Sequence, residues 1–343
     1  MEVCDPADSA RVAEVIRLRA AERWGEVELA DVPSAIGAGF DSSIHLVHLR
    51  GGGLPAEWAE PLVVRILPSA DRDDQATREA EAQTWSRSVG YAAPQVLEVL
   101  AADDAFGLPA QVMERAPGTT MLAALTRRPW RAVALIDQLA GLQLALHALP
   151  TDAWPGSTDP RALADKRLGL PRRSAIDLAH PALTAATERV EAVIPQGLGG
   201  DLVVCHGDFH PLNVVVDGDR AAVIDWTDAG MGPPEADVAR TLLLFQVASI
   251  AATGSVERIA LKLAGPRMRG RYRRTYEHSQ PLDERRLLVW EALHALHGWA
   301  QILTLHAGGF DGESSSAGNE ANVPIEVGEW LRTRFEDAVT ALT

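Results

Sequence analysis

Residues 203–227, VVCHGDFHPLNVVVDGDRAAVIDWT, contain carboxylates and an amide at spacings that suit chemistry on a phosphate and a hydroxyl. Asp208 follows one apolar run, Asn213 comes five residues later, and Asp225 follows the last apolar run. A carboxylate can orient a hydroxyl and accept its proton, whereas carboxylate and amide oxygens suit a hard cation such as Mg²⁺. The segment therefore has the residue types that phosphoryl transfer needs, in which metal ions neutralise the charge of the nucleotide phosphates.

A tight hairpin is predicted within this segment. The apolar runs Val214–Val216 and Ala221–Ile224 predict two short strands, and the Asp217–Gly218 pair between them is a strong hairpin signal. We therefore expect Asn213 and Asp225 to lie close together at the open end of the hairpin. A turn aspartate or a capping asparagine would explain one residue alone, but the combination favours a metal site.

The same segment resembles a known family. The Asp-x-x-x-x-Asn spacing is similar to that of the protein-kinase catalytic loop, and Ile224–Trp226 stands where that fold carries its metal-binding aspartate. The written form, HGDFHPLN followed by IDW, resembles the aminoglycoside phosphotransferase family of small-molecule kinases. The resemblance implies Asp208 as the catalytic residue, Asn213 and Asp225 as metal ligands, and ATP or GTP with Mg²⁺ as cofactors.

The resemblance also implies a fold, an α+β, two-lobed, protein-kinase-like structure. A small, mainly antiparallel β lobe over residues 1–115 would clamp the nucleotide. A large helical lobe over residues 116–343 would carry the catalytic and acceptor-binding residues.

A glycine-containing loop ahead of this segment could bind the nucleotide. The residues before Gly37 and the alternating run Ile44–Leu49 predict two strands joined by a loop of glycine and serine. Backbone N–H groups in such a loop can bind phosphate. A Gly-x-Gly pair is also common in plain turns, and its place ahead of the catalytic segment favours the binding role. The candidate residues are Gly37, Gly39, Ser42 and Ser43.

The next predicted strand, Pro61–Leu67, carries Arg65 where the kinase fold has a phosphate-binding lysine. The resemblance extends to an arginine here and gives Arg65 the same role. We expect Glu79, on a helix predicted over Asp71–Ser88, to pair with Arg65, with Glu81 as the alternative. A later strand ends in MERAPG, which resembles the connection between the lobes in this family. Its candidates for the adenine edge are Met113, Arg115 and Ala116.

Helices dominate the rest of the chain. Apolar residues at three- and four-residue steps predict helices over Trp130–Leu149, His180–Ile194, Val238–Ala252, Leu287–Leu305 and Ile325–Leu342. Residues 151–173 lack clear periodicity and are interpreted as a surface insertion. The basic run 267–274 is interpreted as a solvated face. The resemblance implies that Asp237 braces the catalytic loop by accepting backbone hydrogen bonds.

Five residues are candidates for binding the acceptor. Asp228 and Glu235 follow closely on the metal-binding aspartate, and Glu291 shares a predicted helix face with His294, beside Trp290. If that helix packs against the catalytic loop, these residues line an acidic and aromatic site, which favours an aminated acceptor. The alternative is that they face water or pack in the core.

The composition excludes several other classes of protein. A formal net charge of −15 over 343 residues argues against a broad nucleic-acid-binding surface. The two cysteines cannot form a disulfide framework, the first residues lack a signal-peptide pattern, and the most apolar stretch is shorter than a membrane span. We expect a cytoplasmic monomer or weak homodimer that binds a small-molecule hydroxyl acceptor, without nucleic-acid or membrane partners.

The expected function is ATP-dependent O-phosphorylation of an aminoglycoside-like or otherwise aminated small molecule, which would imply antibiotic resistance. A macrolide, or a metabolic alcohol or sugar, is the alternative acceptor. A catalytically silent nucleotide-binding scaffold is the alternative of another class, but it would be marked by loss of Asp208, Asn213 or Asp225. A protein kinase is disfavoured because the Asp-Phe-Gly and Ala-Pro-Glu signals are missing from the sequence.

Overall fold

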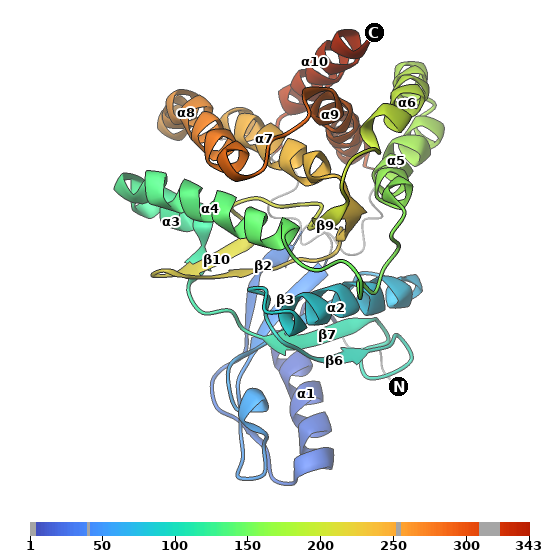
Figure 1. The fold of residues 1–343 in the computed structure, drawn as a ribbon. Helices are drawn as coiled ribbons and strands as arrows, with labels where there is room; N and C mark the ends of the chain where they lie inside the picture. Colours follow the sequence, from blue (N-terminus) through green and yellow to red (C-terminus); the bar gives the residue numbers. More distant parts are fainter. Residues whose placement is uncertain (1–4, 40–41, 252–254, 309–322) are drawn as a thin grey trace. The chain divides into compact units, whose positions relative to one another are not determined.

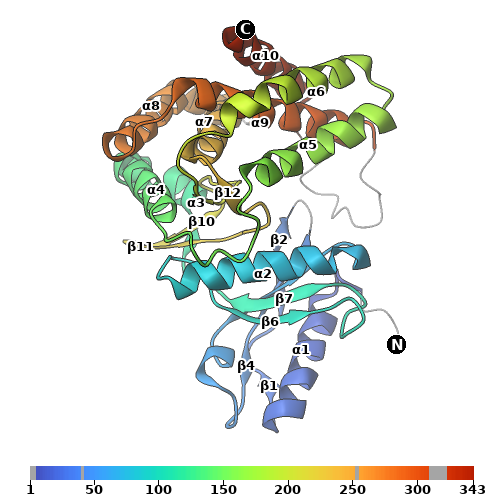
Figure 2. The same ribbon diagram turned by 45° about the vertical axis from the view of Figure 1, so that its right-hand side comes forward.

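The computed structural model describes residues 5–39, 42–251, 255–308 and 323–343. The chain divides into two compact units, which are drawn in Figures 1 and 2. Unit 1 consists of Met1–Gly118 and Val215–Thr227, and unit 2 consists of Thr119–Val214 and Asp228–Thr343. The sequence suggested one boundary at residue 115, whereas the structure also assigns the hairpin segment of the second half to unit 1.

Unit 1 is built on a five-stranded antiparallel sheet with the strand order β2-β3-β5-β7-β6. The strand bounds are β2 Ser34–Gly39, β3 Ser42–Val47, β5 Leu62–Ile66, β6 Val96–Leu100 and β7 Ala110–Glu114. A separate antiparallel pair is formed by β1 Glu28–Leu29 and β4 Leu49–Arg50. The small, mainly antiparallel lobe expected from the sequence is confirmed.

Helices α1 (Ser9–Trp24) and α2 (Asp73–Ser88) pack on opposite faces of this sheet. Alternate residues of β5, from Leu62 to Ile66, are buried in an apolar core together with Ile16 of α1. Because side chains alternate along a strand, Arg65 points to the other face, which α2 covers. Figure 2 shows α2 running alongside β6 and β7.

The hairpin predicted from the sequence is present. Strands β10 (Val214–Asp217) and β11 (Arg220–Val223) are neighbours, and Gly218 in the turn has φ +62°, which glycine adopts without strain. Trp226, just beyond the hairpin, is buried and packs edge-on against Tyr91, with ring centroids 5.7 Å apart. This contact fixes the segment after the hairpin within unit 1.

Unit 2 is mostly helical, as expected. Helix α9 is buried along most of its length and packs against α5, α7 and α10 (Figure 1). The helix bounds are α3 Met121–Arg127, α4 Ala132–His147, α5 Pro160–Asp177, α6 Pro181–Val193, α7 Pro234–Ala251, α8 Ser255–Ser279, α9 Glu284–His306 and α10 Ile325–Leu342. None of the helices in the described ranges has both the length and the apolar character needed to cross a membrane.

The remaining elements are short. Strands β9 (Val203–Cys205) and β12 (Gly230–Gly232) form an antiparallel pair that contacts α7. Strand β8 covers Thr119–Thr120. The 3₁₀ helices are Ala56–Trp58, Ala70–Arg72, Pro129–Arg131 and Ile194–Gly197.

The expectation that residues 151–173 form a surface insertion is wrong. Helix α5 begins at the N-cap Asp159, with a proline at its first position, and packs against α6 and α9. Its buried residues include Arg167 and Pro171, a charged residue and a helix breaker that obscure the apolar period in the sequence. The aspartate cap followed by proline is the signal that marks the start of this helix.

Candidate active-site residues

Arg65 is the centre of a polar cluster in unit 1. Its side chain is 11% exposed, and its Nη1 forms an ion pair with Glu79 of α2. Its Nε donates to Ser42 Oγ at 3.0 Å, and its Nη2 donates to Thr227 Oγ1 at 3.1 Å. Glu79, and not the exposed Glu81, is therefore the partner of Arg65.

Asp225 follows β11 with an unusual backbone conformation, φ +64°. Aspartate tolerates this left-handed region better than most residues, and such strain concentrates at functional sites. Oδ1 of Asp225 accepts a hydrogen bond from Thr227 Oγ1 at 2.7 Å and lies 3.6 Å from Arg65 Nη2. The side chain is 44% exposed, and Oδ2 has no hydrogen bond within the described residues. Asp225 can therefore offer a carboxylate oxygen to a cation.

The predicted phosphate-binding loop joins β2 to β3. Gly37 lies where the register between these strands shifts, and Gly39 pairs with Ser42 at the end of the ladder. Residues 40–41, at the tip, lie outside the described residues. Gly37, Gly39, Ser42 and Ser43 thus flank one hairpin tip, and their contact with phosphate stays a prediction.

The three candidates for binding the adenine edge differ in which of their backbone N–H and carbonyl groups already take part in hydrogen bonds. Met113 lies inside β7, paired with β5 on one side and β6 on the other. The N–H of Arg115 donates to the carbonyl oxygen of Pro61 at 3.0 Å. Ala116 makes no backbone hydrogen bond within the described ranges, so it is the candidate that keeps both its N–H and its carbonyl oxygen.

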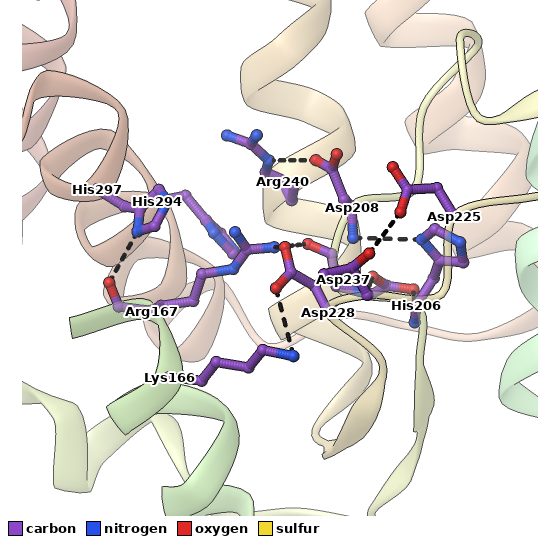
Figure 3. Close-up of polar contacts among 12 residues, drawn as sticks. Lys166, Arg167, His206, Asp208, Asp225, Asp228, Asp237, Arg240, His294 and His297 are labelled. Carbon is purple, nitrogen blue, oxygen red and sulfur yellow. Dashed lines mark hydrogen bonds and ion pairs between the residues drawn. The ribbon is translucent and has the colours of Figure 1, made fainter. Parts of the chain in front are cut away.

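In unit 2, a buried carboxylate braces the loop that carries Asp208 (Figure 3). Asp237 of α7 is completely buried, and its two oxygens accept the N–H groups of His206, at 3.1 Å, and Gly207, at 2.7 Å. His147 Nε2 donates to the same carboxylate at 3.2 Å. Burial raises the pKa of Asp237, but the interactions with His147, His206 and Gln143 together outweigh it and lower this pKa to about 2. The bracing role that the resemblance implied for Asp237 is confirmed.

The same helix holds the loop a second time, and the loop backbone requires a glycine. Thr241 Oγ1 donates to the carbonyl oxygen of Phe209 at 2.7 Å. Gly207 has φ +80°, and a Cβ atom there would lie 2.4 Å from the carbonyl oxygen of Asp228. Any other residue at position 207 would therefore displace the loop.

Asp208 presents a partly exposed carboxylate that two side chains hold. Arg240 Nε lies 2.9 Å from Oδ1, and His210 Nε2 lies 3.1 Å from Oδ2; the Asp208 side chain is 25% exposed. His210 Nδ1 accepts the N–H of Leu212, so its Nε2 carries the proton and donates it to Asp208. Burial raises the pKa of Asp208, but His210 and Arg240 outweigh it and hold this pKa well below its ordinary value. Asp208 is therefore an ionised carboxylate that can accept a hydrogen bond from a hydroxyl.

The amide of Asn213 is oriented so that its oxygen can bind a cation. Nδ2 donates to the carbonyl oxygen of Asp208 at 3.0 Å, and Oδ1 has no hydrogen bond in the described part of the chain. The free oxygens of Asn213 and Asp225 are hard donors of the kind that Mg²⁺ prefers. No group of three or more His, Cys, Asp or Glu residues among those described could hold a metal. A bound Mg²⁺ would therefore take further ligands from water and phosphate, as it usually does. That Asn213 and Asp225 share one ion stays a prediction.

Four of the five residues predicted to bind the acceptor are buried and bonded within unit 2. Glu235, for example, is completely buried and forms an ion pair with Arg286 at 3.0 Å. The other three are buried beside polar partners: Trp290 with Gly197 O, Glu291 with Arg334, and His294 with Ala236 O. The expectation of an acidic and aromatic lining is wrong for these four, and core packing is correct. The physical reason is that α9 packs against helices on several sides at once.

Asp228 is the fifth candidate and is partly exposed. Its carboxylate lies 2.8 Å from Arg167 Nη2 and 3.4 Å from Lys166 Nζ, both on α5 (Figure 3). Burial raises the pKa of Asp228, but Arg167 and Lys166 outweigh it and lower this pKa to about 2. Arg167 also donates to the carbonyl oxygen of Gly207, which ties α5 to the catalytic loop. Contact between Asp228 and an acceptor stays a prediction.

Sequence reasoning missed three residues that hold the catalytic loop or its aspartate: Arg240, His210 and Arg167. Arg240 follows Asp237 by three residues on α7, a spacing that places both on one helix face, so a signal was present. His210 stands inside the HGDFHPLN motif. Arg167 had no usable signal because its helix was not recognised.

The two-lobed fold and the braced loop around Asp208 define a kinase-like phosphotransferase. The chain belongs to the phosphotransferase enzyme family, whose model matches residues 34–288. It is similar to the aminoglycoside 3'-phosphotransferase of Streptomyces fradiae, with 31% identity over 212 residues, which cover 58% of this chain and 75% of that protein. The resemblance inferred from the HGDFHPLN segment is thereby confirmed.

Solved structures show the same fold. A thermostable mutant of aminoglycoside phosphotransferase APH(4)-Ia, in a ternary complex with ADP and hygromycin B, matches with a TM-score of 0.59 and 17% identity over 95% of this chain and 98% of that one. The amicoumacin kinase hAmiN, in complex with AMP-PNP, Ca²⁺ and Ami, matches with a TM-score of 0.58 and 13% identity over 96% and 93%. At these identities the likeness concerns the fold alone.

Proposed function

We propose that this phosphotransferase transfers the γ-phosphoryl group of ATP to a hydroxyl of a small molecule, with Mg²⁺ as its metal cofactor. The observation that carries the proposal is the setting of Asp208, an ionised and 25% exposed carboxylate on a loop that α7 braces through Asp237 and Thr241. A carboxylate held in this way can accept the hydrogen bond of an acceptor hydroxyl and align its oxygen.

In the proposed reaction, the acceptor oxygen forms a bond to the γ-phosphorus of ATP. The bond from this phosphorus to the β,γ-bridging oxygen breaks, and ADP leaves. The proton of the hydroxyl passes to the carboxylate of Asp208. Because the transition state of such a transfer is loose, positioning and charge neutralisation supply most of the catalysis.

Arg65 would bind the phosphates of ATP. A guanidinium has five N–H donors, and the contacts with Glu79, Ser42 and Thr227 use one on each nitrogen. One N–H on each terminal nitrogen remains for phosphate oxygens. Asn213 and Asp225 would hold Mg²⁺, which when bound supplies positive charge beside the phosphates.

For the acceptor, an aminoglycoside-like molecule is the first class to test. The support is the sequence relative from Streptomyces fradiae, which is named an aminoglycoside 3'-phosphotransferase. The acidic lining gives no support, because Glu235 and Glu291 are buried in ion pairs. Macrolides and metabolic alcohols or sugars, the alternatives that the sequence leaves open, are the competing acceptors.

An ADP-coupled assay over these acceptor classes, at fixed Mg·ATP, tests the proposal with the parent protein and Asp208→Asn. We expect the parent to phosphorylate one class, and the variant to lose about 10²-fold or more in kcat while still binding Mg·ATP. Asp217→Asn, the same chemical change at an exposed hairpin residue, is the control and should keep the parental rate. A parental rate in Asp208→Asn would refute the role of Asp208. Nucleotide binding without turnover on any acceptor would favour a silent scaffold.

A further inference from the structure

We propose that Arg240 is a positioning residue for phosphoryl transfer, and that it holds the carboxylate of Asp208 in the orientation that meets the acceptor hydroxyl. This inference deepens the proposed function and rests on it. Helix α7 would then hold the side chain of Asp208 as well as the backbone of its loop.

The contact between the two side chains is direct and largely shielded from water. Arg240 Nε lies 2.9 Å from Asp208 Oδ1, and the Arg240 side chain is only 13% exposed. Figure 3 shows the Nε atom of Arg240, on α7, facing the carboxylate of Asp208. A charge-assisted hydrogen bond at this distance fixes geometry better than a solvated surface pair does.

The two oxygens of Asp208 are held from different sides. Arg240 bonds to Oδ1, whereas His210 Nε2, at 3.1 Å, and Asn213 Nδ2, at 3.3 Å, bond to Oδ2. Each carboxylate oxygen can accept about two hydrogen bonds, so Oδ1 keeps one site for an acceptor hydroxyl. Without Arg240, the remaining side-chain hydrogen bonds act on Oδ2 alone, so the carboxylate is held less firmly against rotation about its Cβ–Cγ bond.

Among the described residues, Arg240 has no second polar partner, so its shielded position is not explained by a link between two structural elements. Within the described residues, its hydrogen bonds and ion pairs are with Asp208 alone. Arg286, by contrast, joins α9 to Glu235 of α7, and Arg167 joins α5 to the catalytic loop. Those arginines connect separate elements, whereas Arg240 acts on one side chain.

The spacing on α7 couples the loop backbone to this side chain. Asp237, Arg240 and Thr241 stand at positions i, i+3 and i+4 and share one helix face. Asp237 holds the backbone before Asp208, Thr241 holds the carbonyl of Phe209 after it, and Arg240 holds the carboxylate. One helix therefore sets both the place and the orientation of the carboxylate before any acceptor binds, which is the preorganisation that catalysis by positioning requires.

Three variants test the proposal by kinetics: Arg240→Gln, Arg240→Lys and, as a matched control, Arg286→Gln. The control also removes an arginine–carboxylate pair from α7, but one that does not touch Asp208. We expect Arg240→Gln to lower kcat by about 10- to 100-fold and to leave KM for Mg·ATP within about twofold. Arg240→Lys should recover part of kcat because it keeps the charge. Arg286→Gln should lower Tm and keep kcat.

Crystal structures of Arg240→Gln and Arg286→Gln provide a readout that does not depend on activity. We expect the Asp208 carboxylate to rotate or to occupy two conformers in Arg240→Gln only. An unmoved carboxylate in that variant, or an equal loss of kcat in both glutamine variants, would overturn the proposal. If the parent phosphorylates no acceptor, the proposed function fails, while the crystallographic comparison still decides whether Arg240 orients the Asp208 carboxylate.

Discussion

Replacing Asp237 by asparagine tests how far the catalytic loop depends on one buried carboxylate. The change keeps the shape of the side chain and removes its charge. Gly207 N–H can still bond to the amide oxygen, but His206 N–H and His147 Nε2–H would then face an amide NH₂ group. Two hydrogen bonds are lost at a position that is completely buried, so water cannot replace them.

The expected loss of stability follows from these contacts. A hydrogen bond to a charged group contributes about 1.5–3 kcal/mol, and the variant is spared the desolvation of a carboxylate. We therefore expect the free energy of unfolding to fall by about 2–4 kcal/mol, and Tm to fall by roughly 3–6 °C for a chain of 343 residues. Because Asp208 follows Gly207 directly, a shift of this loop by ~1 Å should also lower kcat by about 10²-fold.

The loss of stability in Asp237→Asn also depends on pH and becomes smaller as the pH falls. The pKa of Asp237 is about 2 in the folded protein, below its value of about 3.9 in an unfolded chain. As the pH falls, the unfolded chain takes up the proton first, so the stabilisation is complete above about pH 4 and is lost towards pH 2. The difference in stability between parent and variant should therefore narrow over that range.

Urea unfolding of both proteins, at pH 7 and at steps down to pH 3, measures these differences. Asp283→Asn is the matched control, because Asp283 caps α9 by accepting the N–H of Arg286 at 2.8 Å. Asparagine caps a helix about as well as aspartate, so the control should lose less than about 0.5 kcal/mol. An Asp237→Asn protein as stable as the control, or a stability difference unchanged between pH 7 and pH 3, would refute the reasoning.

Three further predictions concern the other residues of the site. Glu79→Gln should raise KM for Mg·ATP by on the order of tenfold with little change in kcat, because Arg65 loses the ion pair that orients it. Steady-state kinetics measures both constants. Asp225→Ala should weaken Mg²⁺-dependent ATP binding more than Asn213→Ala, because a carboxylate brings charge as well as an oxygen. Calorimetric titration with Mg·ATP measures the affinity of each variant. Equal, unaltered affinities in both variants would refute the shared metal site. His297 of α9 borders the site, because its Nδ1 donates to the carbonyl oxygen of Arg167 at 2.8 Å. Burial and nearby Arg167 lower the pKa of His297 to about 4, so the unfolded chain binds the proton first and stability should fall as the pH drops from about 6.5 to 4. Urea unfolding over this pH range should show that the stability of His297→Gln depends less on pH than that of the parent. An identical pH dependence in both proteins would contradict the assignment of this stability change to His297.

The catalytic loop could be predicted from the sequence because its signals are local. The turn pair, the flanking apolar runs and the spacing from Asp208 to Asn213 all lie within one short segment. Asp237 could be recognised for the same reason, since it follows that segment closely and opens an apolar helix. Arg65 could be predicted from its position in a strand. The choice between Glu79 and Glu81 depends on which of them lies on the face of α2 that meets the sheet, and only the structure shows this.

The acceptor-binding residues could not be predicted, because burial depends on partners that are distant in the sequence. Glu235 is neutralised by Arg286, which lies 51 residues away, and Glu291 by Arg334, which lies 43 residues away. An acidic residue next to a catalytic motif gives the same local pattern whether it faces a ligand or a buried arginine. Helix α5 was missed for a related reason, since Arg167 is buried through contacts with the catalytic loop.

These distant pairs also limit how an aminated acceptor could bind. Asp208 and Asp228 are each compensated, the first by Arg240 and the second by Arg167 and Lys166, so the net charge of −15 is not concentrated in this cluster. The pair with Lys166 is the weakest of these, because its two atoms lie 3.4 Å apart and the lysine is 43% exposed. An ammonium group of an acceptor would therefore reach Asp228 by competing with Lys166, whereas at Asp208 it would compete with the acceptor hydroxyl for the one site left on Oδ1.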